Sequence, residues 1–209
     1  MALSGAVLGP LIDVSANATN PPALPLSLPN WTLIATALCT HLQSFGVVTP
    51  TFVAPPTGGP VTGTGTIGGL DPTALGQALT TAATQGNPAA MPTALPHWMP
   101  IAAAIVTQIQ TTCTVLPGTL QAPPGSPATA GGPLTGLGTI TGLSGTPLGD
   151  AMAQAAAAGD ATAYAKIRPT YLDMGSQIAT HVTSLGQVGP GTMVCPPGGG
   201  PIVGSGVVL

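Results

Sequence analysis

The residues that come closest to a chemical motif are three glycines with the spacing Gly63-x-Gly65-x-x-Gly68, the pattern of a dinucleotide-binding loop. Such a loop follows a strand, opens a helix and has an acidic residue about 20 positions further on that contacts the cofactor's ribose. No Asp or Glu lies at that distance, and no Lys follows any glycine run, as a phosphate-binding loop of the Walker type requires. We therefore predict a structural role for these glycines and no bound cofactor.

The titratable side chains do not form a recognisable catalytic set. His41 and His181 align in the internal repeat described below, where the second copy has Gln108. Replacement by Gln favours a hydrogen-bonding role at a helix surface or interface over a role as base or metal ligand. The aspartates mostly lie near predicted helix starts, where a carboxylate stabilises the helix dipole; they are Asp13, Asp71, Asp150, Asp160 and Asp173. We predict no catalytic residue and no enzymatic activity, and a cleft holding both histidines with an Asp would contradict this.

Three cysteines, an odd number, do not make a disulfide framework. Cys39 aligns with apolar residues of the other copies, so we expect it to be a small core residue. A disulfide between Cys113 and Cys195 remains open as an alternative. No Cys-x-x-Cys or paired histidine accompanies them, and we predict no metal site.

Charge is almost absent from the chain, which has five Asp, one Lys, one Arg and no Glu in 209 residues. Globular proteins carry roughly 25% charged residues. With only Lys166 and Arg168 as basic side chains, the composition argues against nucleic acid as a direct partner. No apolar run reaches the roughly 20 residues of a membrane span, and no basic segment typical of a signal peptide opens the chain. A surface this poor in charge is poorly protected against association, so we expect much of it to be buried in a larger assembly.

A glycine-rich run occurs three times, at residues 56–67, 131–140 and 199–208. The similarity extends outward from these runs over the whole chain and divides it into residues 1–70, 71–143 and 144–209. Repeats of this kind share a core or complete one another's sheets. We predict three tandem units of one α+β design.

Each unit begins with a predicted short helix that has an N-cap residue, namely Ser4, Asp71 or Ser144. Apolar residues follow at i and i+4, on one face. Glycine recurs in all three helices, at Gly9, Gly76 and Gly149, which suggests close backbone packing there.

After a linker (residues 17–28, 85–95 and 159–168) that is Pro-rich in the first two units, a second helix is predicted to start with Pro-x-aromatic. Its apolar residues recur with the helical period in all three units. The aromatic residues are Trp31, Trp98 and Tyr171. They could form a ligand-stacking trio, but we favour a role in the core, in which each covers the glycine-rich strand of its own or a neighbouring unit.

Two extended segments close each unit: one at residues 47–53, 115–120 or 189–194, and then the glycine run. Alternation along the run places glycines on one face, where another backbone or a side chain can approach closely. These packing or interface glycines are Gly63, Gly65, Gly136, Gly138, Gly204 and Gly206. We predict two helices followed by a short Gly/Thr-rich β-hairpin per unit, in a pseudo-threefold arrangement.

The unit resembles small structural proteins of tailed bacteriophages and phage-like particles. The resemblance lies in the aromatic-led helix at Trp98-Met99-Pro100-Ile101-Ala102-Ala103-Ala104-Ile105 and in Gly136-Leu137-Gly138-Thr139-Ile140. It implies a virion or phage-like particle as the location, capsid decoration or a tail or baseplate joint as the role, and other structural proteins, or further copies of the chain, as partners. A secreted or cell-surface coat protein is the alternative expectation.

Overall fold

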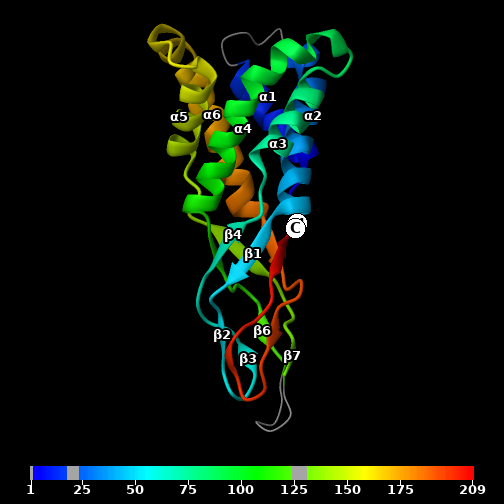
Figure 1. Ribbon diagram of the computed structural model, residues 1–209, viewed down its shortest axis with the longest axis vertical. Coiled ribbons are helices and arrows are strands. Elements are labelled where there is room, and N and C mark those ends of the chain that lie inside the picture. Colours follow the sequence, from blue (N-terminus) through cyan, green and yellow to red (C-terminus); the bar gives the residue numbers. More distant parts are fainter. Residues whose placement is uncertain (1, 18–23, 124–130) are drawn as a thin grey trace.

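The computed structural model describes residues 2–17, 24–123 and 131–209. Helices form one end of an elongated molecule and strands form the other (Figure 1). The predicted α+β class is confirmed.

Among the described residues, six α-helices and one 3-10 turn make up the helical end. Each α-helix packs against the next one along the chain, and α6 packs against α1, which closes a ring. The elements are α1 (Gly5–Ala16), α2 (Leu24–Phe45), α3 (Pro72–Ala83), η2 (Pro88–Ala90), α4 (Met91–Thr112), α5 (Gly145–Ala157) and α6 (Ala161–Leu185).

The predicted N-caps of α1, α3 and α5 are confirmed in position, although only the carboxylate of Asp71 accepts a capping hydrogen bond, from the Thr73 amide. Close packing at the recurring glycines is also confirmed. A Cβ on Gly9 would lie 2.5 Å from Cα of Thr32 in α2, and a Cβ on Gly149 would lie 2.6 Å from Cα of Leu172 in α6. Glycine is needed because each pair of helices touches backbone to backbone there.

The predicted linkers are wrong where the structure describes them, because most of their residues are helical. Residues 18–23 of the first linker lie outside the described residues. The second helices begin well before Trp31, Trp98 and Tyr171, with Pro29, Pro96 and Pro169 inside them. Each of these prolines lies beyond the first turn and so removes one intrahelical hydrogen bond. In α6 the Asp160 side chain also accepts hydrogen bonds from two amides and caps the added turns.

Six strands next to the helices form a closed barrel in the order β1-β12-β9-β8-β5-β4, all paired antiparallel. Pairs between strands of one predicted unit alternate around the barrel with pairs between two units. The strands are β1 (Val47–Pro50), β4 (Gly65–Gly68), β5 (Thr114–Leu116), β8 (Gly138–Thr141), β9 (Gln187–Gly189) and β12 (Gly206–Val208).

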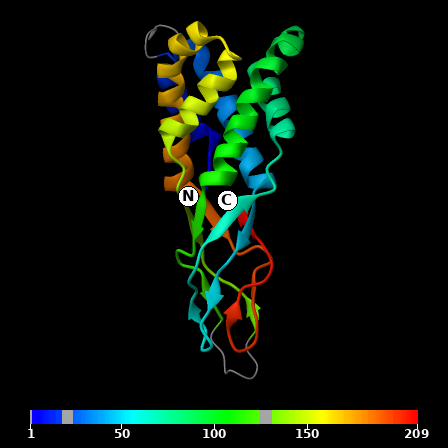
Figure 2. The same ribbon diagram turned by 60° about the vertical axis from the view of Figure 1, so that its left-hand side comes forward.

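Below the barrel, three two-stranded sheets each join two different predicted units: β11 with β2, β3 with β6, and β10 with β7. Isolated bridges Val53–Thr62, Gln121–Thr135 and Val194–Val203 connect these sheets into a second closed ring. The lower strands are β2 (Val53–Ala54), β3 (Gly59–Pro60), β6 (Gln121–Ala122), β7 (Gly132–Pro133), β10 (Val194–Cys195) and β11 (Gly200–Pro201). Figure 2 shows the two β-layers continuing the long axis of the helical end.

The strand bounds differ from those predicted, because each extended segment is divided between the two rings. The glycine run likewise forms β3 and β4, with a turn between them at Gly63, where φ is 113°. Inward-facing residues of both rings belong to one buried core. They are Val48, Val115 and Val188, then Ile67, Ile140 and Val208, and below them Phe52, Leu120 and Met193, with Val61, Leu134 and Ile202.

Candidate functional site

The first set of predicted glycines makes turns within the β-rings. Gly63, Gly136 and Gly204 all have positive φ, at 113°, 91° and 93°. A Cβ on Gly136 would lie 2.1 Å from the carbonyl oxygen of Thr119, and one on Gly204 the same distance from that of Thr192. Both the backbone angle and the space therefore require glycine. The atoms that approach these three glycines most closely belong to the backbone of the same chain, so the glycines serve the packing of the fold.

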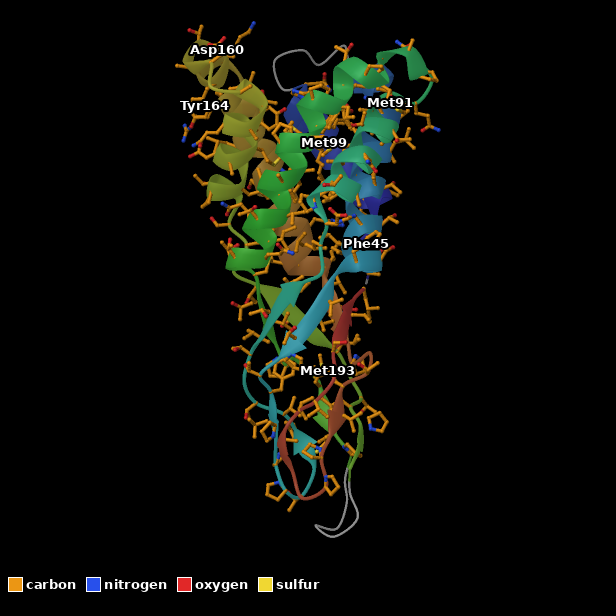
Figure 3. The ribbon with its side chains drawn as sticks, viewed as in Figure 1. Phe45, Met91, Met99, Asp160, Tyr164 and Met193 are labelled. Carbon is orange, nitrogen blue, oxygen red and sulfur yellow. The ribbon has the colours of Figure 1, made fainter. Side chains whose placement is uncertain are left out.

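The second set lies inside the barrel. Gly65, Gly138 and Gly206 are buried. A Cβ on Gly206 would meet the Met193 side chain at 2.4 Å, and one on Gly138 would lie 3.5 Å from a methyl group of Leu120. Gly206 and Gly138 thus leave room for large side chains of the lower ring, of which Met193 is labelled in Figure 3, whereas a Cβ on Gly65 would meet Val48 and Val115 of the barrel.

The aromatic trio does not cover these glycines, so that part of the prediction is wrong. Trp31, Trp98 and Tyr171 lie on α2, α4 and α6, within the helical end, and pack half-buried against the core. Burial raises the pKa of the Tyr171 hydroxyl to about 12. The predicted role of the three aromatic residues in the core agrees with this placement. The residues that pack over the glycines come instead from neighbouring strands, which become adjacent only when the barrel closes.

The cysteines are free thiols, so the Cys113–Cys195 disulfide is not formed. Cys113 follows α4 at the top of the barrel, and Cys195 lies on β10 in the lower ring. Cys39 is a buried core residue, as predicted. Burial raises the pKa of Cys39 to about 11 and that of Cys113 to about 12, which keeps both thiols protonated.

The two aligned histidines lie at different junctions between helices. His181 on α6 accepts a hydrogen bond at Nε2 from the Ser4 amide, 3.1 Å away, at the start of α1. This confirms the predicted hydrogen-bonding role at an interface. His41 lies between α2 and α3, where its buried Nε2 has no hydrogen-bond partner among the described residues. Burial lowers the pKa of both imidazoles, and the charge of Asp71 opposes this at His41.

Charge is concentrated on α5 and α6. Arg168 forms an ion pair with Asp150, with its Nε 2.7 Å from Oδ1, and the Tyr164 hydroxyl donates to the same carboxylate oxygen over 3.1 Å. The hydrogen bond from Arg168 lowers the pKa of the Asp150 carboxyl. These contacts join the first turns of α6 to α5, near Tyr164 and Asp160 in Figure 3. They are surface interactions between two helices, with a structural role.

A groove of about 590 Å³ lies between α2 and α3. Its walls carry no charged side chain and are mostly apolar, with Gln85 and three threonines as the polar residues; the apolar residues include Leu33, Ala37, Ala78, Ala82 and Met91. A second hollow of about 430 Å³ shares Ala37, Ala78 and Thr81 and continues the groove past His41 to Phe45. Phe45 and Met91 mark the two ends of the groove in Figure 3. We call the whole feature the α2–α3 groove.

The groove has a simple origin in the sequence. In α3, Ala74 and Ala78 stand at the positions that α1 fills with Val7 and Leu11. The small side chains leave space against α2. The larger ones on α1 are 44% and 42% exposed, and Val14, one further turn along, is 59% exposed.

A second apolar surface follows the line where the last strands meet the first. Val47 on β1 pairs with Val207 on β12, and lower down Val53 pairs with Pro201, two residues before Val203 in the chain. All four valines are between 42% and 58% exposed. We call this surface the valine seam. The positions aligned with Val53 and Val203 in the second unit are Gln121 and Thr135, so the seam is apolar on one side of the molecule.

Comparison of the chain with protein-family models, with curated proteins and with solved structures finds no match. By length and composition, one helical stretch of the described residues, Pro88–Thr112, is apolar enough to cross a membrane, which qualifies the prediction that no run is long enough. One such helix is weak evidence for a membrane span, and this stretch packs against α3 and α5.

Proposed function

We propose that the chain is a non-enzymatic structural component of a bacteriophage virion or phage-like particle, in capsid decoration or at a tail or baseplate joint. In this proposal residues 1–70, 71–143 and 144–209 are three copies of one unit about a pseudo-threefold axis. One chain then occupies a local threefold site that a trimer of single units would otherwise fill.

The observation that carries the proposal is the strand order of the two β-rings. Each predicted unit contributes two strands to the barrel, and each lower sheet joins a different pair of units. Strand exchange of this kind is the topology expected of an intertwined trimer whose three chains have been fused. It also makes every unit depend on the other two, because an isolated two-stranded ribbon is only marginally stable.

Surface chemistry supports a place inside an assembly. The valine seam and the outer face of α1 expose apolar side chains, and the charged residues are few. Contiguous exposed apolar side chains of this kind are typical of protein–protein contact sites. The partners we propose are other structural proteins of the particle and further copies of the chain.

The test is to locate the protein in purified particles by cosedimentation and in a cryo-electron microscopy map. We expect one elongated density per threefold site. A double variant with Val53→Lys and Val203→Lys should fold but fail to enter particles, because both side chains are exposed and charges would be buried at the contact.

The matched control is Gln121→Lys with Thr135→Lys, which places the same charges at the aligned positions outside the seam. Absence of the wild-type protein from purified particles would contradict the particle role. Equal incorporation of the two double variants would contradict only the contribution of the valine seam, and the particle role would stand.

A further inference from the structure

We propose that the helical end opens on acidification, with α1 and α2 separating from α3 and α6 while the two β-rings stay closed. The inference goes beyond the proposed particle role and does not depend on it. It rests on two buried imidazoles, His41 and His181, which lie where the helices of the first predicted unit meet those of the other two.

The ring of helices has three junctions between predicted units: α2 with α3, α4 with α5, and α6 with α1. His41 lies at the first of these junctions and His181 at the third. At the aligned position of α4 the chain has Gln108, which does not titrate. The α1–α2 pair therefore has a histidine at both of its junctions, whereas each other pair of helices has a histidine at one.

The contact at the α6–α1 junction requires a neutral imidazole. The His181 side chain is buried, and its Nε2 accepts a hydrogen bond from the Ser4 amide over 3.1 Å. A protonated imidazole carries a hydrogen on both ring nitrogens and cannot accept. Protonation of His181 thus places two N–H donors against each other at the start of α1 and removes the bond that joins the two helices.

The α2–α3 junction has no place for a charged imidazole. His41 is 3% exposed and its ring packs against Phe45, with the ring centroids 4.7 Å apart. Its buried Nε2 has no hydrogen-bond partner in the part of the chain that the structure describes. A charge on a nitrogen that neither water nor an acceptor reaches is costly, and separation of the helices removes that cost by hydrating the ring.

The charged groups around His41 do not offset this cost. Asp71, the N-cap of α3, favours the charged ring, but its carboxylate already accepts a hydrogen bond from the Thr73 amide over 2.8 Å. No other charged side chain belongs to α2 or α3. On α1 the only charged residue is Asp13, near the opposite end of the helix, where it accepts a hydrogen bond from Asn17.

Around His181 the charged groups are likewise engaged or distant. On α5, Asp150 is held in the ion pair described above. On α6 itself, Asp173 is exposed and lies about two turns away. Leu209 ends the chain near the start of α1, and its backbone oxygen accepts a hydrogen bond from the Leu3 amide.

The direction of the pH effect follows from burial. Burial lowers the pKa of both rings, and at His41 it outweighs the opposing charge of Asp71. An imidazole in water takes up its proton near pH 6.5, so the hydrated rings of the open form are protonated first as the pH falls. The closed junctions are therefore fully favoured above about pH 6.5 and lose this advantage below it.

The β-rings lack such a trigger. Their twelve strands contain no histidine and no aspartate. The first helix pair is joined to them through Gly46, the single residue between α2 and β1. Acidification therefore acts on the packing of α1 and α2 and leaves the pairing of the strands unchanged.

The chain has its own reporters for the test, because its free cysteines are buried in different parts of the fold. Cys39 lies on α2, and Cys195 lies on β10 in the lower ring. The free protein is labelled with dithiodipyridine, which reacts with thiols in acid as well as at neutral pH, at about pH 8 and about pH 5. Peptide mass spectrometry gives the rate at each cysteine, and division by the rate of the urea-unfolded chain at the same pH removes the pH dependence of the thiol chemistry.

We expect the normalised rate at Cys39 to rise several-fold on acidification and the rate at Cys195 to change little. An unchanged rate at Cys39, or an equal rise at both cysteines, would overturn the proposal. This comparison uses the wild-type chain and so needs no variant.

The double variant His41→Gln with His181→Gln places at both positions the residue type that the second unit already has. It should lose the acid response of Cys39. The matched control is His97→Gln, which changes the exposed histidine of α4 and should keep the response. A response that persists in the double variant, or disappears in the control, would overturn the assignment of His41 and His181 as the trigger. Both experiments use the free protein, so their outcome and the presence of the protein in particles are decided separately.

Discussion

Replacement of Gly136 by Ala separates two physical reasons for a glycine at this turn. Gly136 has φ at 91°, and an added Cβ would lie 2.1 Å from the Thr119 carbonyl oxygen. Gly86 has the same φ of 91° in the loop after α3, with no atom within 4 Å of the added Cβ. Gly86→Ala therefore reports backbone strain alone, and Gly136→Ala reports strain together with a steric clash.

The expected magnitudes follow from these two environments. An L-residue in a left-handed conformation costs about 1–2 kcal/mol, which is the whole effect expected at Gly86. At Gly136 the Thr119 carbonyl cannot retreat freely, because the Thr119 amide donates to the Leu137 carbonyl over 2.8 Å and the Leu137 amide donates to the Thr119 hydroxyl over 3.0 Å. Overpacking against a held group adds about 1–3 kcal/mol. We expect a total loss of about 2–5 kcal/mol.

The assay is urea unfolding of both variants and the wild type, with thermal melting as a second measurement. For a chain of this size each kcal/mol lowers Tm by about 2–4 °C, so Gly136→Ala should melt roughly 10 °C below wild type. Equal losses of unfolding free energy in the two variants would refute the clash, and with it the assignment of Gly136 as a packing residue.

Three further outcomes are expected from the buried and capping residues. Phe52→Ala should lower the free energy of unfolding by about 3–5 kcal/mol, because Phe52 is fully buried in the lower ring, whereas Val53→Ala, at an exposed neighbour, should change it little. Asp71→Ala should cost about 1 kcal/mol through the lost helix cap, and Ser144→Ala less, because the Ser144 side chain makes no capping bond. Because burial lowers the pKa of His181, the unfolded chain takes up a proton first as the pH falls through about 6.5; stability should therefore decrease on acidification, and less so in His181→Gln.

Urea unfolding measures all three. Similar losses for Phe52→Ala and Val53→Ala would contradict the buried position of the phenylalanine. A Ser144→Ala variant as unstable as Asp71→Ala would contradict the capping assignment. An acid-induced loss of the same size in wild type and His181→Gln would show that other groups cause it.

Local patterns in the sequence predicted the helices and their contacts well. The caps at Ser4, Asp71 and Ser144 are read from residue type, and the glycines at positions 9 and 149 indicate close packing because few other reasons place glycine inside a helix. The prolines misled the prediction, since the predicted linkers ahead of Pro96 and Pro169 turned out to contain the first turns of α4 and α6. A proline shows where a helix can start, but burial and a cap such as Asp160 decide whether it starts earlier.

The candidate site was largely beyond the reach of the sequence. Repetition of the glycine runs predicted that several segments share one β-structure, but it did not predict that each extended segment is divided between two rings. The residues that pack over Gly206 and Gly138 are Met193 and Leu120, which become their neighbours only when the barrel closes. Similarly, Ala74 and Ala78 look like ordinary helix residues until α3 lies against α2.

The sequence alone thus determined the mixed α+β class, the helix caps and the scarcity of charge, all of which depend on local residue type. The tertiary structure decided the rest: which strands pair, what fills the space beside the glycines, and where the apolar side chains stay exposed. The reason is that hydrogen bonds along a strand specify neither partner nor register. Those are chosen when distant segments bury their side chains together.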